Sequence, residues 1–209
     1  MIKAVPLLVS CWALLGCGTN RPEIPDELKH AGNAYGSEEG DTVQNFCFVG
    51  YRDPTTARSD AADFETVCFY DYHDPNGTKG YAVLIVNTAA VWCQACKVEH
   101  STLPDRFTEL APRGLALLSA LFEDTDSNPA QPEHLNAWIG AFDVNFPMVL
   151  DPEYQMGTYA SRETAPLNLI IDARTMVILK KEIGDHPAVL WPFVEEQLAQ
   201  RGRRSNSPV

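Results

Sequence analysis

The amino-acid sequence predicts an α/β sandwich built around a mixed β-sheet. Strand-like apolar runs alternate with helical segments between residues 81 and 150, and two further strand candidates then follow one another without a helix between them. Alternation of this kind places helices against a sheet, and the final pair adds antiparallel strands. The chain has 209 residues, of which 45% are hydrophobic and 21% charged. This is ordinary globular composition, and the length suits one domain with a short appendage.

The first predicted elements are a hairpin and a buried strand. Segments 43–51 and 66–72 are rich in strand-favouring residues and flank a polar loop, so they predict an N-terminal hairpin extension within residues 41–80. Asp74-Pro75-Asn76-Gly77 predicts a turn. The run 81–86 is apolar throughout, which is typical of a strand covered on both faces.

The later elements continue the alternation. A helix begins at Cys93 and carries Leu103, Phe107 and Leu110 at helical spacing. A second helix, over 132–142, begins with a proline, which is tolerated at the first helical position. The remaining strand candidates are 115–121, 146–150, 167–171 and 176–180, and a last helix carries its apolar stripe on Val189, Leu190, Phe193, Val194 and Leu198.

The two ends of the chain lie outside the predicted domain, which spans residues 41–200. A lysine and the apolar run 4–15 predict a signal peptide over residues 1–16. At about 1.5 Å per residue, this run is too short to cross a hydrocarbon core of about 30 Å as a helix. Residues 17–40 contain scattered Pro and Gly without apolar periodicity and predict a flexible tether, and residues 201–209 predict a disordered basic tail.

The signal peptide ends in Leu14-Leu15-Gly16-Cys17, which resembles the bacterial lipobox. In that class of signals the chain is cut before the cysteine, the thiol receives a diacylglycerol and the new amine is acylated. The resemblance implies lipidation at Cys17 and anchoring in the bacterial cell envelope, facing the periplasm. Several acyl chains together anchor a protein stably in a membrane, whereas a single chain does not. Gly18 stands where an aspartate would retain the protein at the inner membrane, which favours the outer membrane. A plain signal peptide with an incidental cysteine is the alternative.

Acidic residues outnumber basic ones. The chain has 28 Asp and Glu against 16 Lys and Arg, for a net charge of -12. A surface of this charge repels phosphate backbones, so we expect no nucleic-acid partner.

The chemistry concentrates at Trp92-Cys93-Gln94-Ala95-Cys96. A Cys-x-x-Cys that follows a buried strand and opens a helix is the context of a redox motif. Cys93 would stand at the positive end of the helix dipole, where free N–H groups stabilise a thiolate, and Cys96, one turn inward, could attack a mixed disulfide. A structural disulfide is the main alternative. His100 gives Cys-x2-Cys-x3-His, but zinc would need a fourth ligand, so we predict no metal; Lys97 stands where haem attachment requires histidine.

Residues 83–99 resemble the active-site strand, turn and helix of thioredoxin-fold proteins, and most closely the membrane-tethered, periplasm-facing TlpA-like group, which overlaps the redoxin families. Thr164-Ala165-Pro166 before a strand is a second match. The resemblance covers residues 75–200 and implies a thioredoxin-like three-layer sandwich without a cofactor. It implies that Pro166 is cis, packs against the redox cysteines and presents its preceding backbone to the substrate. It also implies that Trp92 shields the cysteine pair.

Several positions depart from the thioredoxin pattern. Asn87 stands where thioredoxin carries a buried aspartate, and an amide cannot accept the proton. The resemblance to the TlpA-like group implies that Glu99, about one helical turn after Cys96, takes this role; a solvated surface carboxylate is the alternative. The dipeptide Gln94-Ala95 lacks the histidine with which strongly oxidising relatives stabilise the thiolate, which favours a reducing or isomerising function.

Two cysteines remain once the signal peptide, the lipidation site and the redox motif are accounted for. These are Cys47 and Cys68, one in each arm of the predicted hairpin. We expect them to form a structural disulfide with each other.

The leading functional prediction is an exported, lipid-anchored thiol–disulfide oxidoreductase that acts on protein disulfides and receives electrons from a membrane or periplasmic thiol donor. A peroxiredoxin-like thiol peroxidase is the second reading. Such enzymes resemble Pro-x-x-x-Thr-x-x-Cys, whereas here Ala90 lies three residues before Cys93 and Thr88 five. A copper-binding assembly factor would need two cysteines with three residues between them and a histidine shortly before the strand 167–171. This chain has two residues between its cysteines, and residues 161–166 contain no histidine. A non-catalytic binding module stays open.

We predict that the full-length protein partitions with membranes and incorporates labelled fatty acid at Cys17. Cys17→Ser should abolish the label, because the modified thiol is gone. Metabolic labelling with a fatty-acid analogue in a bacterial host measures this, and Cys11→Ser is a matched control that should keep the label. A soluble wild-type protein, or label retained by Cys17→Ser, would contradict the anchor.

Overall fold

The computed structural model describes residues 35–56 and 63–205, and the centre of this part of the chain is a seven-stranded sheet. Its strand order is β2-β1-β5-β4-β3-β6-β7. β3 pairs in parallel with β4, and β4 with β5, while the other neighbouring pairs are antiparallel. The predicted α/β class with a mixed sheet is therefore confirmed. The strands are β1 Cys47–Tyr51, β2 Glu65–Cys68, β3 Val83–Ala90, β4 Leu115–Glu123, β5 Met148–Leu150, β6 Leu167–Asp172 and β7 Ile178–Ile183.

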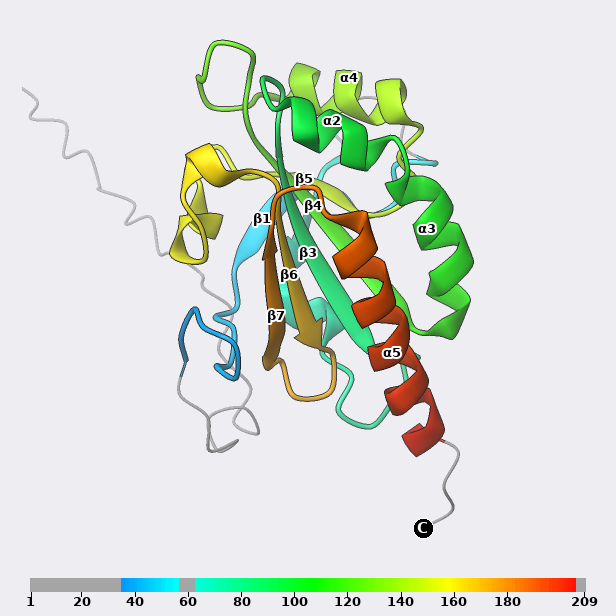
Figure 1. Ribbon diagram of the computed structural model, residues 1–209. Coiled ribbons are helices and arrows are strands. Elements are labelled where there is room, and N and C mark those ends of the chain that lie inside the picture. The colour runs from blue at the N-terminus through cyan, green and yellow to red at the C-terminus, as the bar shows by residue number, and fades with distance from the viewer. Residues whose placement is uncertain (1–34, 57–62, 206–209) are drawn as a thin grey trace, which may run out of the picture.

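Helices cover the sheet and one end of it. Figure 1 shows α3 and α5 along one face of the strands, with α2 and α4 above the end where β3 leads into α2. The ion pair between Arg106 of α3 and Glu195 of α5, at 2.8 Å, joins the first two. The helices are α2 Gln94–His100, α3 Leu103–Leu110, α4 Pro132–Phe142 and α5 Pro187–Ser205, and the 3-10 turns are η2 Phe69–Tyr72, η3 Ala111–Arg113, η4 Gln155–Thr158 and η5 Arg162–Thr164.

The core is centred on β3 and β4, in which every residue is buried. Both strands consist mainly of Val, Leu, Ile and Ala, as expected for strands covered on both faces. Polar side chains nevertheless interrupt this core at Asn87, Ser119 and Asn168, each of them 0% exposed. Buried polar groups of this kind require hydrogen-bond partners, and they mark the region from which the candidate site is built.

The single helix predicted after the motif is two helices, α2 and α3, separated by Ser101 and Thr102. Pro104, in the first turn of α3, explains the break, because proline has no N–H to donate to the carbonyl of His100 four residues before it. Ser101 Oγ donates to Val98 O at 2.6 Å and Thr102 Oγ1 to Glu99 O at 3.0 Å. The two hydroxyls thus bond to carbonyls in the last turn of α2.

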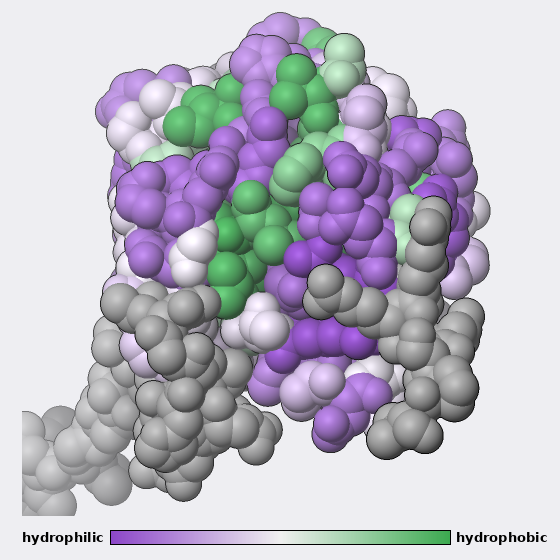
Figure 2. Space-filling view, turned by 60° about the horizontal axis from the view of Figure 1, so that its bottom comes forward, coloured by the Kyte–Doolittle hydropathy of each residue, from purple (hydrophilic) through white to green (hydrophobic). Residues whose placement is uncertain are grey.

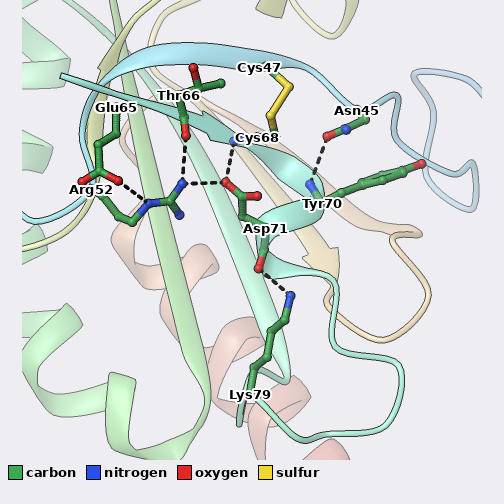
Figure 3. Close-up of polar contacts among 9 residues, drawn as sticks. All are labelled: Asn45, Cys47, Arg52, Glu65, Thr66, Cys68, Tyr70, Asp71 and Lys79. Carbon is green, nitrogen blue, oxygen red and sulfur yellow. Dashed lines mark hydrogen bonds and ion pairs between the residues drawn. A yellow bond between two sulfur atoms is a disulfide. The ribbon is translucent and has the colours of Figure 1, made fainter. Parts of the chain in front are cut away.

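The predicted hairpin forms, but its second arm is shorter than expected. β1 and β2 pair antiparallel with Cys47 opposite Cys68, whereas residues 69–72 form η2. Asp71 accounts for the change, as Figure 3 shows: its Oδ2 accepts the N–H of Cys68 at 2.9 Å and pairs with Arg52 Nη2 at 2.9 Å. The carboxylate closes a turn at the end of β2 and directs the chain out of the sheet.

The last predicted residues of the tether are attached to the edge strand β7. Gly40 N–H donates to Ile178 O at 2.9 Å, and Lys181 Nζ lies 3.2 Å from a carboxylate oxygen of Glu38. Residues 35–40 therefore pack as part of the domain, and a flexible tether is wrong for them. The predicted signal peptide and Cys17 lie outside the described residues.

The predicted disordered tail is wrong for residues 201–205, which continue α5. Arg201 forms an ion pair with Asp172 at the end of β6, with Nη2 2.9 Å from Oδ2. Both side chains are largely shielded, so the pair ties the last turns of the helix to the sheet. The end of the predicted tail, 206–209, lies outside the described residues.

One face of the described domain is mainly hydrophilic. Figure 2 shows one face on which polar and charged residues surround smaller hydrophobic groups. The large hydrophobic side chains most exposed to solvent are Val98, Val49, Val189, Ile183 and Tyr35. Within residues 35–56 and 63–205, no helix has the length and apolar character needed to cross a membrane.

We predict that the Cys47–Cys68 disulfide stabilises the domain. It joins residues 21 positions apart, and closing such a loop restricts the unfolded chain by about 3 kcal/mol. The double variant Cys47→Ala/Cys68→Ala should lose about this much free energy of unfolding in urea titrations of the oxidised protein. The double serine variant controls for side-chain packing and should lose a similar amount. An unchanged urea midpoint in both would contradict a stabilising role.

Candidate functional site

The two motif cysteines lie where β3 ends and α2 begins. A tight turn, in which Cys93 N–H donates to Ala90 O at 3.0 Å, connects the strand to the helix. Cys93 is the N-cap of α2 and is bonded to Cys96 in a disulfide. The backbone N–H of Cys96 donates to Cys93 Sγ at 3.0 Å. A helix N-terminus with an N–H directed at sulfur favours negative charge on Cys93 when the disulfide is reduced.

The residue before Pro166, just ahead of β6, contacts this disulfide. The Ala165–Pro166 peptide bond is cis, and Ala165 O lies 3.5 Å from Cys93 Sγ. Leu167 N–H donates to Thr88 Oγ1 at 3.0 Å, and Gly184 N–H donates to Pro166 O at 2.7 Å. The loop before β6 is therefore fixed on both sides, with one backbone carbonyl held against the reactive sulfur.

Both cysteines of the motif are nearly closed to solvent. Cys93 is 3% exposed and Cys96 0% in this disulfide-bonded form. Cys93 remains the more accessible of the two, but only slightly, because Trp92 and the loop before Pro166 lie around it. Attack by or on Cys93 thus needs contact with a surface that fits closely around the sulfur.

Trp92 is held in place by a carboxylate that the sequence did not single out. The indole Nε1–H donates to Glu123 Oε2 at 2.8 Å, and Arg162 pairs with the other oxygen of Glu123. The Arg162 guanidinium also lies over the ring of Tyr154, 5.0 Å from its centroid. Beside these groups is a hollow of about 370 Å³ lined by Trp92, Glu123, Ser127, Arg162 and Glu163. It adjoins both the motif and the turn that leads to Pro166.

Glu99 is buried beneath the site and is 4% exposed, so a solvated carboxylate is excluded. Its Oε2 accepts from Asn87 Nδ2 at 2.7 Å and its Oε1 from Asn168 Nδ2 at 2.5 Å. Burial raises the pKa of Glu99 to about 7, the two amide donors lower it, and the like charge of Asp185 raises it slightly. A carboxyl with this pKa can accept and release a proton near neutral pH.

His100, at the end of α2, lies deeper than Glu99 and is 0% exposed. Its Nδ1 lies 3.1 Å from Cys96 O, and its Nε2 lies 3.0 Å from Ser119 Oγ. Both ring nitrogens therefore face partners other than the cysteine sulfurs. Burial lowers the pKa of His100 to about 4, so the ring is neutral near pH 7.

Sequence reasoning did not identify Asn168, Ser119, Glu123 or Arg162 as part of the site. For Asn168 and Ser119 a signal was present, since each is a polar residue inside an otherwise apolar strand. Glu123 and Arg162 carry no such signal, because a charged residue at the end of a strand or in a loop is ordinarily solvated.

The second cysteine pair lies elsewhere. Cys47 and Cys68 form a disulfide between β1 and β2, at the edge of the sheet farthest from β6 and β7. β5 and β4 separate this hairpin from β3, which leads into the motif. The pairing expected from the sequence is present.

Several solved structures share this fold, and some of them are named as thiol–disulfide proteins. A candidate thiol:disulfide interchange protein DsbE from Chlorobium tepidum is 16% identical, with a TM-score of 0.58 over 79% of this chain and 98% of its own. The thioredoxin domain of a thiol-disulfide oxidoreductase from Bacteroides vulgatus is 14% identical, with a TM-score of 0.57 over 77% of this chain and 98% of its own. StoA from Bacillus subtilis is 17% identical, with a TM-score of 0.51 over 74% of this chain and 96% of its own. At these identities the likeness shows the shared thioredoxin fold.

No curated protein matches the sequence significantly. The model of the AhpC/TSA family matches residues 40–181, which include the hairpin, the Cys93–Cys96 motif and Pro166. The match covers more than half of the chain, and the chain therefore belongs to the AhpC/TSA family of thioredoxin-fold proteins.

Proposed function

We propose that the protein is a thiol–disulfide oxidoreductase that exchanges its Cys93–Cys96 disulfide with disulfides of protein substrates. The observation that carries this proposal is the disulfide at the N-terminus of α2, with the carbonyl of Ala165 3.5 Å from Cys93 Sγ. A backbone carbonyl before a cis proline, next to a reactive sulfur, offers an acceptor for the N–H of an extended substrate chain.

In the first step the reduced enzyme attacks its substrate. The Cys93 thiolate, favoured by the N–H of Cys96 and the start of α2, forms a bond with one sulfur of the substrate disulfide. The substrate's own S–S bond breaks, and its second sulfur leaves as a thiolate that takes up a proton. Trp92 and Pro166 limit access to this mixed disulfide, and the hollow beside Trp92 accommodates substrate groups next to the cysteine.

In the second step Cys96 resolves the mixed disulfide. Its thiol gives a proton to the Glu99 carboxylate, and the thiolate attacks Cys93 Sγ. The Cys93–Cys96 bond forms while the bond to the substrate breaks, and the substrate leaves with its second thiolate. The substrate has gained two electrons and the enzyme has lost two, so a thiol donor must reduce Cys93–Cys96 before the next cycle.

We further propose that the protein works in the reducing direction, exported and anchored by lipid at Cys17 to the periplasm-facing side of the bacterial envelope, with the outer membrane favoured. The lipobox-like Leu14-Leu15-Gly16-Cys17 supports the anchor, and the Gln94-Ala95 dipeptide supports the direction. Its electron donor is then a membrane or periplasmic thiol, and its substrates are envelope proteins with disulfides.

Peroxide reduction is the second candidate, because the family match favours it. Here a Cys93 thiolate would attack a peroxide, giving an alcohol and a sulfenic acid that Cys96 condenses to the disulfide with loss of water. Thr88 does not serve as the polar group three residues before the cysteine; its hydroxyl accepts the N–H of Leu167, and Ala90 stands at that position. Peroxide consumption faster than protein-disulfide reduction would favour this second reading.

A third possibility is that the Cys93–Cys96 disulfide is only structural. A reduction potential of this disulfide below about -300 mV would favour that possibility.

We predict that Cys93 is the attacking cysteine. In the reduced protein near neutral pH, alkylation followed by mass spectrometry should modify Cys93 well before Cys96. Cys93→Ser should abolish exchange, and Cys96→Ser should accumulate mixed disulfides, because the resolving thiol is gone. Faster labelling of Cys96, or adducts trapped only by the Cys93 variant, would reverse the assigned roles.

We predict that Glu99 makes stability depend on pH. Its pKa is about 7 in the folded protein and near the ordinary 4.5 when unfolded, so the folded state binds more protons between these values. The contribution of Glu99 to stability is therefore complete below about pH 4.5 and is lost as the pH rises to about 7. Asp151, whose pKa burial raises to about 6, and His100, whose pKa burial lowers to about 4, titrate over the same range in both proteins. Urea unfolding from pH 4 to 8 should therefore show the loss due to Glu99 as a pH-dependent difference between wild type and Glu99→Gln.

The matched control for this titration is Glu109→Gln, which removes an exposed carboxylate on α3. It should follow the wild-type pH profile. A difference between wild type and Glu99→Gln that stays constant over this pH range would contradict the assigned ionisation.

A further inference from the structure

His100 is a buried titratable group that the proposed exchange steps do not use. It links the backbone of α2 to the polar core through one continuous series of contacts. Nδ1 faces Cys96 O, Nε2 faces Ser119 Oγ, and Ser119 Oγ lies 2.9 Å from Asn87 Oδ1. Asn87 Nδ2 then reaches Glu99 Oε2 and also Asn168 Oδ1, at 3.0 Å.

The orientation of the Asn87 amide is fixed by its neighbours. Its nitrogen faces two oxygens, of Glu99 and Asn168, so the amide hydrogens must point there. Its oxygen therefore faces Ser119 and can only accept. Cys96 O, a backbone carbonyl, can also only accept.

Three contacts in this series require three hydrogens. They are Cys96 O with Nδ1, Nε2 with Ser119 Oγ, and Ser119 Oγ with Asn87 Oδ1. A neutral imidazole supplies one hydrogen and the hydroxyl another. One contact is thus always left without a hydrogen, and the burial of His100 disfavours the imidazolium that would complete all three.

Three arrangements share this shortage, and the one in which Nδ1–H donates to Cys96 O while Ser119 donates to Asn87 leaves two acceptors, Nε2 and Ser119 Oγ, facing each other at 3.0 Å. In the first of the other two, Nε2–H donates to Ser119, whose hydroxyl donates to Asn87, and every donor is directed towards Glu99. In the second, Nδ1–H donates to Cys96 O, Ser119 donates to Nε2, and Asn87 Oδ1 is unpaired. Hydrogen bonds in a series polarise one another, so an ionised Glu99 favours the first arrangement and a protonated Glu99 favours the second.

We propose that His100 is a positioning residue whose tautomer switches with the protonation of Glu99, from Nε2–H when Glu99 is ionised to Nδ1–H, bonded to the Cys96 carbonyl, when Glu99 is protonated. If the proposed exchange holds, on which this functional link rests, the switch follows proton transfer from Cys96 to Glu99. It then stabilises protonated Glu99 by pairing the carbonyl of the resolving cysteine.

The surroundings leave few other charges to drive the switch. The like charge of Asp185, before α5, acts on Glu99, and the neighbouring cysteine pair does not titrate while it is oxidised. Around His100 the ring contacts come from Trp138 and Phe142 of α4 and from Phe146. These aromatic neighbours carry no charge, so Glu99 is the group whose titration the His100 ring senses.

Nuclear magnetic resonance tests the switch without any activity assay. In oxidised protein labelled with ¹⁵N in histidine, the His100 ring should change from the Nδ1–H to the Nε2–H pattern as the pH rises through the midpoint of the Glu99 carboxyl ¹³C signal. His186, exposed and paired with Glu182, is the control, and its ring signals should show no change of tautomer at that midpoint. A single His100 tautomer on both sides of the Glu99 midpoint would overturn the proposal.

Two variants should shift the titration midpoint of Glu99 in opposite directions. In His100→Phe, Ser119 is free to donate to Asn87 at all times, so ionised Glu99 keeps its support and its midpoint should fall. In Ser119→Ala, Asn87 Oδ1 is never paired and His100 stays on Cys96 O, so the Glu99 midpoint should rise. Shifts in the same direction, or none, would indicate that His100 and Ser119 only fill space. Absence of exchange activity in wild type would refute the proposed function and leave this titration test intact.

Discussion

The buried parallel pair of β3 and β4 is the constraint on which the site depends. Since β6 runs antiparallel to β3, the end of β3 that leads to Cys93 lies beside the start of β6, where Pro166 stands. β4 ends at the same edge and supplies Glu123, whose carboxylate holds Trp92. Groups distant in the chain thus meet where the carboxyl ends of parallel strands open, the place at which α/β sheets commonly bind ligands.

The second feature that shapes the site is a carboxylate in the core. An unpaired buried carboxylate is costly, and Glu99 is retained because Asn87 and Asn168 each donate to one of its oxygens. Hydrogen bonds to a charged group contribute about 1.5–3 kcal/mol each, which offsets part of the cost of desolvation. The part of the desolvation cost that these hydrogen bonds do not offset raises the pKa of Glu99 to about 7. The same packing that buries the carboxylate therefore suits it to transfer protons near neutral pH.

The sequence predicted most of the fold because apolar runs and turns are local signals. It also placed Cys93, Cys96, Glu99 and Pro166 through a resemblance of motif and spacing. It failed where a tertiary or side-chain contact decides the local structure. Asp71 turns the chain after β2, and Arg201 extends α5 by pairing with Asp172. The partners of Glu99 come from strands far apart in sequence, so spacing along the chain could not reveal them, although the polar residues inside apolar strands marked the region.

The charges around the motif bear on the direction of exchange. A strongly oxidising dithiol is one whose reduced form is stabilised, commonly by a cation or histidine beside the thiolate. Here Arg162, which lines the hollow beside Trp92, is paired with Glu123, and the like charge of Asp185 acts on Glu99. His100, the histidine on α2, is buried with both ring nitrogens away from the sulfurs. The helix N-terminus thus favours the thiolate without a histidine beside the sulfur, which supports the proposed direction, from Cys93 and Cys96 to the substrate.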